Sequence, residues 1–160
     1  MRSIKAALAT ILVPGLGCVL APYTILRATH LPLDSPIWVL QILAIVIAAL
    51  GWGMIIWVSY AFVSLGKGTP IPIEPPTRLV VSGLYRYLRN PMYTGALLVI
   101  LAEALYFGAL ALVLYAAGLC VVFQTFLVWL EEPQLKRRFG GAYLDYLNEV
   151  PRWMPRLRRS

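Results

Sequence analysis

The sequence predicts an all-α, polytopic membrane protein with four transmembrane helices. Hydrophobic residues make up 60% of the 160 residues, charged residues only 13%, and the mean hydropathy is +0.75, whereas about a quarter of a soluble domain is charged. Four apolar stretches each approach the roughly 20 residues that a helix needs to cross a bilayer. The same composition excludes intrinsic disorder, and the presence of only 2 cysteines excludes a disulfide scaffold.

The first apolar stretch runs from Ala6 to Leu26 and contains no charged residue. Pro14 and two nearby glycines interrupt it, which in a membrane helix favours a kink or a close helix contact. The basic start, Met1 to Lys5, also resembles the first part of a signal peptide. Because the apolar stretch continues well past any small-residue cleavage site, we expect residues 6–26 to be retained as span 1.

The second stretch, Ile37 to Leu65, is 29 residues long and uncharged, so span 2 is expected to tilt or to project from the membrane. Span 3 is predicted at residues 91–108 and span 4 at residues 109–130. Only Gly108 separates these two spans. They should therefore form a tight helical hairpin.

The basic residues predict the orientation of the spans. With both termini in the cytoplasm, the N-terminal tail, the loop 66–90 and the C-terminal segment 131–160 lie on the inner side. This arrangement places every basic residue except Arg27 inside, as the positive-inside rule requires. Topology thus accounts for the net charge of +7 without a nucleic-acid partner. A bacterial or archaeal plasma membrane and an ER-type membrane both remain open.

Two polar segments, residues 82–95 and 131–156, flank the predicted hairpin, so its geometry should bring them together at the cytoplasmic side. Glu131 and Glu132 end the last apolar span, where the negative end of the helix dipole disfavours anions. Arginines or a cationic ligand should therefore compensate the two carboxylates. Adjacent helical positions point about 100° apart, so at most one of the two is expected to face a pocket, while the other caps the next helix or pairs with an Arg.

A further helix is predicted after the last span, with Pro133 as its first residue. Its apolar positions recur at steps of four, four and three residues, which is typical of an amphipathic helix lying on the membrane surface. The Gly140-Gly141 pair should weaken this helix or permit a close approach. The positions concerned are Leu135, Phe139, Tyr143 and Tyr146.

The segment entering span 3 holds two arginines three residues apart. On a helical turn Arg86 and Arg89 would share a face and suit a carboxylate or phosphate, and anchoring at the headgroups is an equally open alternative. Pro91 fits the first turn of span 3, with Asn90 as its N-cap.

Other chemically active side chains are sparse. Glu103 is the one ionisable residue inside a span, which makes it a candidate catalytic residue, although it can also simply reach the outer interface. Cys120 is expected to be a packing residue and His30 a loop residue. With a single His and no clustered Cys, no metal site is expected.

Taken together, the two polar segments resemble the superfamily of isoprenylcysteine carboxyl methyltransferases and phospholipid methyltransferases. The resemblance rests on Gly83 to Gly95, followed by a hydrophobic hairpin, Glu131-Glu132-Pro133, residues 139–143 and Val150 to Trp153. It covers about half of the chain, from Thr77 to Arg156. Either motif alone would be a weak signal.

The resemblance implies a membrane-embedded methyltransferase that uses S-adenosyl-L-methionine from a cytoplasm-facing pocket. Among the residues that carry the resemblance, Glu131 and Arg89 are the candidate catalytic residues, and Glu103 is a third candidate because of its position inside a span. Asn90 stands where the family usually has His, and Leu84 where Pro is common, so an acid or base role at position 90 is in doubt. The resemblance implies cofactor binding by Arg89, Asn90, Pro91, Tyr93, Gly95, Glu131, Glu132 and Arg152. Further cofactor-binding candidates in the same two segments are Tyr85, Arg86 and Tyr143.

The acceptor is expected to be a lipophilic small molecule or a lipid that is reached from the bilayer. An isoprenylated carboxylate, a phospholipid amine and a small lipophilic amine or thiol all remain open, as does the oligomeric state. One alternative is a membrane NADPH-dependent reductase of related fold, in which Arg137 and Arg138 would bind the 2′-phosphate. A noncatalytic membrane scaffold or carrier is the other.

Overall fold

The structure, a computed structural model, describes residues 15–29, 37–64, 79 and 81–155. These residues form helices joined by short links, and they contain no β-strand. The first part of the predicted span 1, residues 6–14, lies outside the described residues. The loop residues 66–78 and both chain ends lie outside them as well.

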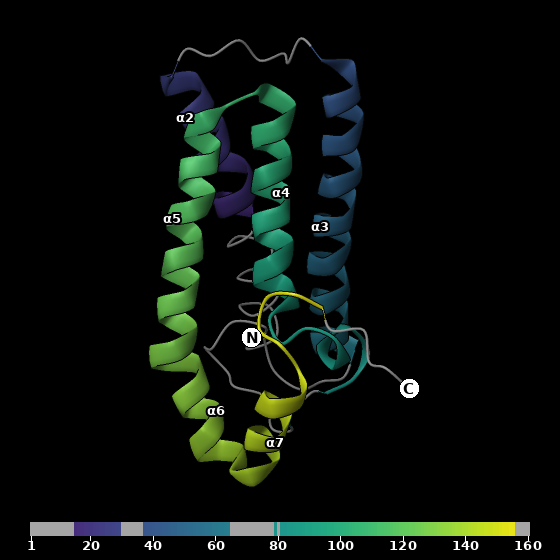
Figure 1. The fold of residues 1–160 in the computed structure, drawn as a ribbon, viewed down its shortest axis with the longest axis vertical. Coiled ribbons are helices and arrows are strands. Elements are labelled where there is room, and N and C mark those ends of the chain that lie inside the picture. Colours follow the sequence, from purple (N-terminus) through teal and green to yellow (C-terminus); the bar gives the residue numbers. More distant parts are fainter. Residues whose placement is uncertain (1–14, 30–36, 65–78, 80, 156–160) are drawn as a thin grey trace.

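Three long helices stand side by side, with α4 between α3 and α5 (Figure 1). Their bounds are Trp38–Ser64 for α3, Pro91–Phe107 for α4 and Leu110–Phe126 for α5. A shorter helical segment, the π-helical turn η1 (Leu16–Leu20) followed by α2 (Ala21–Ala28), packs against α4 and α5. Buried side chains from all four segments meet in the core, which contains Cys18, Ile55, Val99, Ile100 and Ala116.

Among the described residues, two helices are long and apolar enough to cross a membrane, Trp38–Ala61 and Leu110–Phe139. Few of their side chains are buried inside the isolated chain. Helix α4 has a similar apolar character but only 17 residues, which correspond to about 26 Å of helix.

Helices α3 and α4 touch backbone to backbone through two glycines. A Cβ atom added to Gly51 would lie 2.7 Å from the carbonyl oxygen of Gly95, and a Cβ on Gly95 would lie 2.7 Å from that of Gly51. Small residues allow such close approach, which drives helix association where the hydrophobic effect cannot. This contact fixes the position of the start of α4 along the axis of α3.

Helix α4 ends at Gly108, whose left-handed conformation, with φ of 63°, favours glycine. Ala109 is extended, and α5 then runs antiparallel to α4 (Figure 1). The Ala109 N–H donates to the carbonyl of Ala104, which satisfies one of the last carbonyls of α4.

The expectation that the last span ends before Glu131 is wrong. The helix continues without a break through the π-helical turn η3 (Leu127–Glu131) into α6 (Glu132–Phe139). Pro133 is accommodated in the first turn of α6, because the preceding widened turn does not need its N–H. The two glutamates therefore lie inside a helix of 30 residues and not at its negative end.

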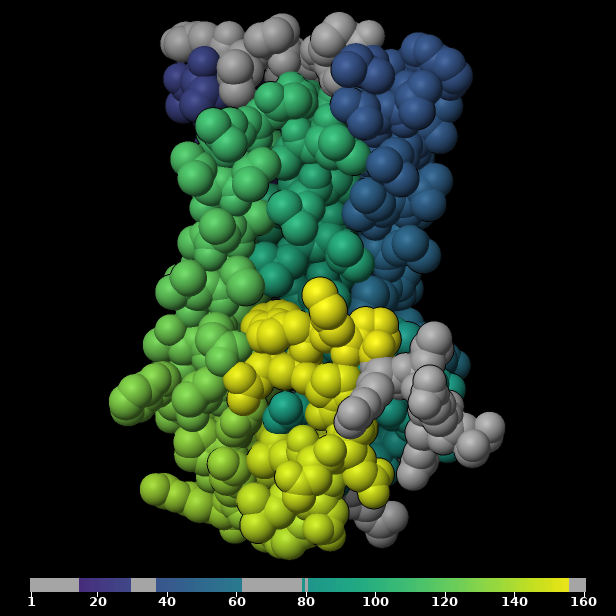
Figure 2. Space-filling view, viewed as in Figure 1, coloured from purple at the N-terminus to yellow at the C-terminus, as the bar shows by residue number. Residues whose placement is uncertain are grey.

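The single amphipathic helix expected from Leu135 to Tyr146 is also not observed. Gly140 has a positive φ of 55° and separates α6 from α7 (Gly141–Glu149). The chain reverses there, and the segment after α7 crosses the lower end of α4 (Figures 1 and 2). Tyr143, Tyr146 and Val150 form a small core beneath that end, with Leu79, Leu135 and Phe139 packed against it.

A candidate active site at the start of helix α4

The π-helical turn η3 directs both glutamates towards the first turn of α4. Glu131 contacts Tyr93, and Glu132 contacts Arg89, which lies four residues before Tyr93. Glu132 thus takes one of the two roles expected for a glutamate that does not face a pocket, which is pairing with an arginine. A π turn has more residues per turn than an α turn, so successive side chains are rotated less.

Glu132 is the centre of an ion-pair cluster. Its Oε1 atom lies 2.6 Å from Nη2 and 3.0 Å from Nε of Arg152, and 3.4 Å from Nη1 of Arg89. The Glu132 side chain is 12% exposed, against 15% for Arg89 and 24% for Arg152. The arginine compensation predicted for the glutamate pair is thus observed at Glu132.

Glu131 has a different environment. Its Oε2 atom accepts a hydrogen bond of 3.1 Å from the Tyr93 hydroxyl. Among the described residues, no Lys or Arg lies within ion-pair distance of this carboxylate. The Tyr93 ring packs on Phe123 of α5, with 4.8 Å between ring centroids. The two neighbouring carboxylates therefore differ in their partners. Glu132 pairs with two arginines, whereas Glu131 accepts a hydrogen bond from a tyrosine whose ring packs on Phe123.

The segment after α7 is attached to this cluster by hydrogen bonds at several points. The Arg89 N–H donates to the Pro151 carbonyl at 2.9 Å, and Asn90 Nδ2 donates to the Arg152 carbonyl at 3.5 Å. Asn90 occupies the N-cap position of α4, but its side chain makes no capping hydrogen bond. Position 90 therefore connects the entrance of α4 to the C-terminal segment.

Trp153 fastens the same segment to α5. Its Nε1 donates to Gln124 Oε1 at 2.9 Å. Gln124 was not singled out from the sequence, although a glutamine within an apolar span usually hydrogen-bonds to another segment. That signal would have identified it.

Three tyrosines surround the carboxylates as neutral hydroxyls. Burial, followed by the charges of Glu132 and Glu131, raises the pKa of Tyr143 to about 12. Burial also raises the pKa of Tyr85 and of Tyr146, with Glu131 contributing at Tyr85 and Tyr143 at Tyr146. The Tyr146 hydroxyl donates to the Tyr85 carbonyl at 2.8 Å, which links α7 to the turn before α4.

The remaining predicted site residues lie apart from the carboxylates or serve packing. Arg86 ends the short 3₁₀ helix η2 (Gly83–Arg86) and is exposed, whereas Arg89 is largely buried. The two arginines do not share a helical face, because the chain turns between them at Tyr87. Pro91 is buried as the first residue of α4, and Gly95 faces Gly51 of α3.

Glu103 lies ten residues beyond Tyr93 on α4, about 15 Å along the helix axis. Its Oε2 atom is buried, with no hydrogen-bond partner among the described residues. The structure does not bring Glu103 together with Glu131 or Arg89.

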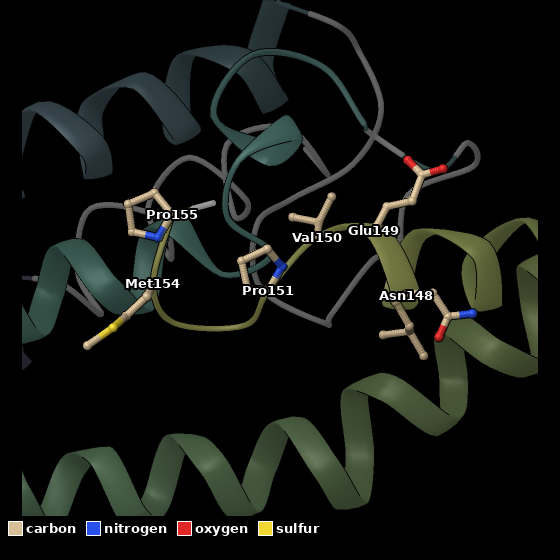
Figure 3. A pocket seen from close by; sticks show the side chains of 7 residues that line it. Asn148, Glu149, Val150, Pro151, Met154 and Pro155 are labelled. Atoms are coloured by element: carbon tan, nitrogen blue, oxygen red, sulfur yellow. The ribbon is translucent and has the colours of Figure 1, made fainter. Parts of the chain in front are cut away.

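A groove of about 270 Å³ borders this region on the side of the C-terminal segment (Figure 3). It is lined by residues 147–151 together with Met154 and Pro155. Pro151 belongs both to this lining and to the backbone contact with Arg89. The lining does not include either carboxylate of the cluster. Among the described residues, no group of three His, Cys, Asp or Glu side chains suits a metal ion.

Comparison with known proteins agrees with the two motifs. A model of the phospholipid methyltransferase family matches residues 39–142, which include α3, α4, α5 and both glutamates. No curated protein matches the chain. The resemblance recognised in the two polar segments is confirmed. Because the match covers well over half of the 160 residues, the chain belongs to the phospholipid methyltransferase family, a family of membrane methyltransferases.

Proposed function

We propose that this protein is a multi-pass membrane enzyme that transfers a methyl group from S-adenosyl-L-methionine to a lipophilic acceptor reached from the bilayer. The observation that carries the proposal is the cluster of two carboxylates and two arginines. These four side chains come from the start of α4, the helix continuing from α5, and the segment after α7. Both ion pairs of the described residues lie in this cluster, at one end of the long apolar helices.

The distribution of basic residues supports a cytoplasmic location for this cluster. Among the described residues, Arg27 lies at the end of α2, on the opposite side of the bundle from the cluster. The other basic residues lie before α4, on α6 or after α7. Under the positive-inside rule, the end with α6 and α7 faces the cytoplasm. We further propose that all four apolar segments cross the membrane and that both termini face the cytoplasm.

The residues present fit the chemistry of this methyl donor. Arg89 Nε is buried and has no hydrogen-bond partner among the described residues, so it can donate to the carboxylate of an amino-acid group. Glu131 suits an ammonium group or a ribose diol, and the ring pair of Tyr93 and Phe123 offers an apolar wall for a base. When bound, the donor supplies a methyl group attached to a positively charged sulfur atom. This sulfur becomes a neutral thioether when the methyl group is transferred.

The environment of Glu131 favours an amine over a carboxylate as the acceptor. A second buried carboxylate beside Glu131 would add like-charge repulsion to the cost of desolvation. An ammonium group would instead neutralise Glu131, and the neighbouring aromatic rings would favour a cation. Among the acceptors that the sequence leaves open, an amine therefore suits this site best.

Transfer to an amine requires the loss of one proton from the acceptor. The acceptor nitrogen forms a bond to carbon while the bond from carbon to sulfur breaks, and the proton passes to a base. We assign this base to Glu131, whose carboxylate accepts a hydrogen bond from the Tyr93 hydroxyl. Arg89 and Arg152 pair with Glu132 and fix the shape of the site. Positioning and exclusion of water provide the remaining catalysis.

Titration of the purified protein with S-adenosylhomocysteine, the demethylated donor, tests the proposal. We expect saturable binding that weakens about tenfold or more in Glu131→Gln, corresponding to about 1.4 kcal/mol. Asp145→Asn on the exposed face of α7 is the control and should bind like the wild type. Equal affinity in Glu131→Gln and wild type would remove Glu131 from the site, and no binding to the wild type would contradict donor use.

A further inference from the structure

The last turn of α6 carries a run of basic side chains outside the carboxylate cluster. Lys136, Arg137 and Arg138 form this basic turn, and all three side chains are exposed. Among the described residues, only Arg89 and Arg152 form ion pairs, and both pair with the carboxylate cluster. The basic turn therefore presents three positive charges that no carboxylate of the described residues neutralises.

The length of the helix places the basic turn at the level of the lipid headgroups. The continuous helix Leu110–Phe139 has 30 residues, which correspond to about 45 Å at 1.5 Å per residue. A bilayer is about 40 to 45 Å thick with its headgroups and about 30 Å thick without them. The helix begins after the link between α4 and α5, at the end of the bundle opposite α6 and α7 (Figure 1). When it crosses from the outer headgroup layer, as proposed above, its last turn lies in the inner one.

The side chains that precede α6 on the same helix support this depth. Trp129 is 77% exposed, and Leu130 after it is 50% exposed. Tryptophan is enriched at the boundary between hydrocarbon and headgroups. The basic turn follows Trp129 by seven to nine residues, which is about 10 to 14 Å along the helix axis. Apolar side chains, a tryptophan and basic side chains thus follow one another in the order of acyl chains, interface and phosphates in a leaflet.

The packing of α6 turns its basic side away from the rest of the chain. Leu135 and Phe139 of α6 pack against the small core that Tyr143 and Tyr146 of α7 form. The apolar side of α6 is therefore covered by α7, which lies beside it at the end of the bundle (Figure 1). The basic turn is exposed and does not belong to that core, so lipid headgroups can approach it from the side.

We infer that the basic turn of α6 binds the phosphate groups of anionic phospholipids in the cytoplasmic leaflet. Charge complementarity selects this partner, because each Lys or Arg near an anionic membrane surface strengthens the attraction about fivefold, whereas a zwitterionic headgroup has no net charge. The inference rests on the proposed orientation of the chain but not on methyl transfer. Since α6 begins at Glu132, lipid bound at its last turn also holds the carboxylate cluster at the membrane surface.

Photolabelling with two lipids that differ only in their headgroups tests the inference without measuring catalysis. The purified protein is placed in phosphatidylcholine vesicles that contain either phosphatidylglycerol or phosphatidylcholine with a diazirine close to the glycerol, and the labelled residues are identified by mass spectrometry. We expect the phosphatidylglycerol probe to label residues 129–139 about tenfold more than the phosphatidylcholine probe. This difference should shrink as the salt concentration rises from about 0.05 M to about 0.5 M. Equal labelling by the two probes would overturn the inference.

Two exposed arginines at opposite ends of the bundle supply a matched pair of variants. Arg137→Gln and Arg27→Gln remove the same charge, one from α6 and one from the end of α2. We expect Arg137→Gln to reduce phosphatidylglycerol labelling of residues 129–139 about fivefold and Arg27→Gln to leave it unchanged. Replacing Lys136 and Arg138 by Gln as well should abolish the preference for phosphatidylglycerol. An equal fall in the two single variants would show that the label follows net charge alone, which would overturn the inference.

Two further measurements identify the source of the phosphate and separate this inference from the proposed function. Excess unlabelled phosphatidylglycerol should displace the label, whereas inorganic phosphate at the same concentration should not. Equal displacement by inorganic phosphate would indicate a site for soluble anions and would overturn the inference. Absence of S-adenosylhomocysteine binding to the wild type would refute the proposed function and leave the lipid preference standing. Intact donor binding without a preference for phosphatidylglycerol would refute only the role of the basic turn.

Discussion

At the scale of single residues, the two adjacent glutamates of the site have different hydrogen-bond and ion-pair partners. Glu132 meets two guanidinium groups, and Glu131 meets one hydroxyl. A buried carboxylate without a cation is costly, and burial raises the pKa of Glu131. We therefore assign Glu132 to the architecture and propose Glu131 as the carboxylate that meets a ligand. This division predicts different consequences for substitutions at neighbouring positions.

Replacing Glu132 by Gln should chiefly reduce stability. The substitution leaves Arg89 and Arg152 without their shared anion, which we expect to lower the free energy of unfolding by about 2 to 3 kcal/mol, below the cost for a fully buried pair because Arg152 is partly exposed. Thermal unfolding in detergent measures this effect. Asp145→Asn is the control, and a Glu132→Gln protein that melts with the control would contradict the role assigned to Glu132.

Replacing Tyr93 by Phe should chiefly reduce turnover. The ring and its packing on Phe123 remain, and only the hydrogen bond to Glu131 is lost. A hydrogen bond to a charged group contributes about 1.5 to 3 kcal/mol, so kcat/KM should fall about tenfold or more with little change in melting temperature. Tyr87→Phe, at an exposed tyrosine of the preceding turn, should leave kcat/KM unchanged. A fall of the same size in Tyr87→Phe would show that Tyr93 has no particular role.

The residue types of the site and the compensation of a glutamate by arginines were predictable from the sequence, whereas the partner of each individual glutamate was not. The motifs identify Arg89, Tyr93, Glu131 and Glu132 because each lies at a fixed distance from the hairpin. The π-helical turn that directs both glutamates towards α4 leaves no periodic signal. An α-helical arrangement of the same residues separates the two side chains by about 100°, which predicts one glutamate facing a pocket and the other capping the next helix or pairing with an arginine, without saying which is which.

At the scale of elements, the contact between α3 and α4 sets the position of the site. Gly95 belongs to the motif resembling the family, yet its observed neighbours are Gly51, Met54 and Ile55 of α3. We therefore assign it to helix packing. Because Gly95 lies only two residues beyond Tyr93, a change in this packing should move the site as well.

Gly95→Ala should separate the two helices. The added methyl group would lie 2.7 Å from a backbone oxygen of α3, which cannot move without shifting the helix. Overpacking of this kind costs about 1 to 3 kcal/mol, so the melting temperature and donor affinity should both fall. In Gly118→Ala, where the space is open, stability should be unchanged or slightly increased. Equal stability of the two variants would contradict the close contact between α3 and α4.

Trp153→Phe should loosen the segment after α7. The substitution removes the indole N–H that donates to Gln124, a loss of about 1 kcal/mol. We expect faster hydrogen exchange in residues 146–155 and weaker binding of S-adenosylhomocysteine. Trp129→Phe on the exposed surface of the long helix is the control. Unchanged exchange in Trp153→Phe would show that this hydrogen bond does not hold the segment.

The helices themselves were largely predictable, because composition and uninterrupted apolar runs determine them. Residues 37–65 and 91–108 correspond closely to α3 and α4. The region after residue 130 was not predictable, since a proline and two glycines favoured breaks at positions where only Gly140 provides one. Pro133 is tolerated because it occupies the first turn of α6, after a widened turn.

At the scale of the whole molecule, the paired charged side chains and the exposed apolar side chains occupy different parts of the helical bundle. The helices expose apolar side chains along their length, and the ion pairs gather at the end formed by α4, α6 and α7 (Figure 1). A polar site at the edge of an apolar bundle can take one reactant from water and another from the membrane. This arrangement is the physical basis for proposing methyl transfer to a lipid.

Transfer of a labelled methyl group tests that central claim most directly. The protein in vesicles of dioleoyl phosphatidylethanolamine and phosphatidylglycerol is incubated with methyl-labelled S-adenosyl-L-methionine, and the lipids are extracted and identified by mass spectrometry. We predict label on the headgroup nitrogen, equimolar formation of S-adenosylhomocysteine, and loss of both products in Glu131→Gln. Donor binding without label in any extracted lipid, or equal label in Glu131→Gln and wild type, would contradict the account.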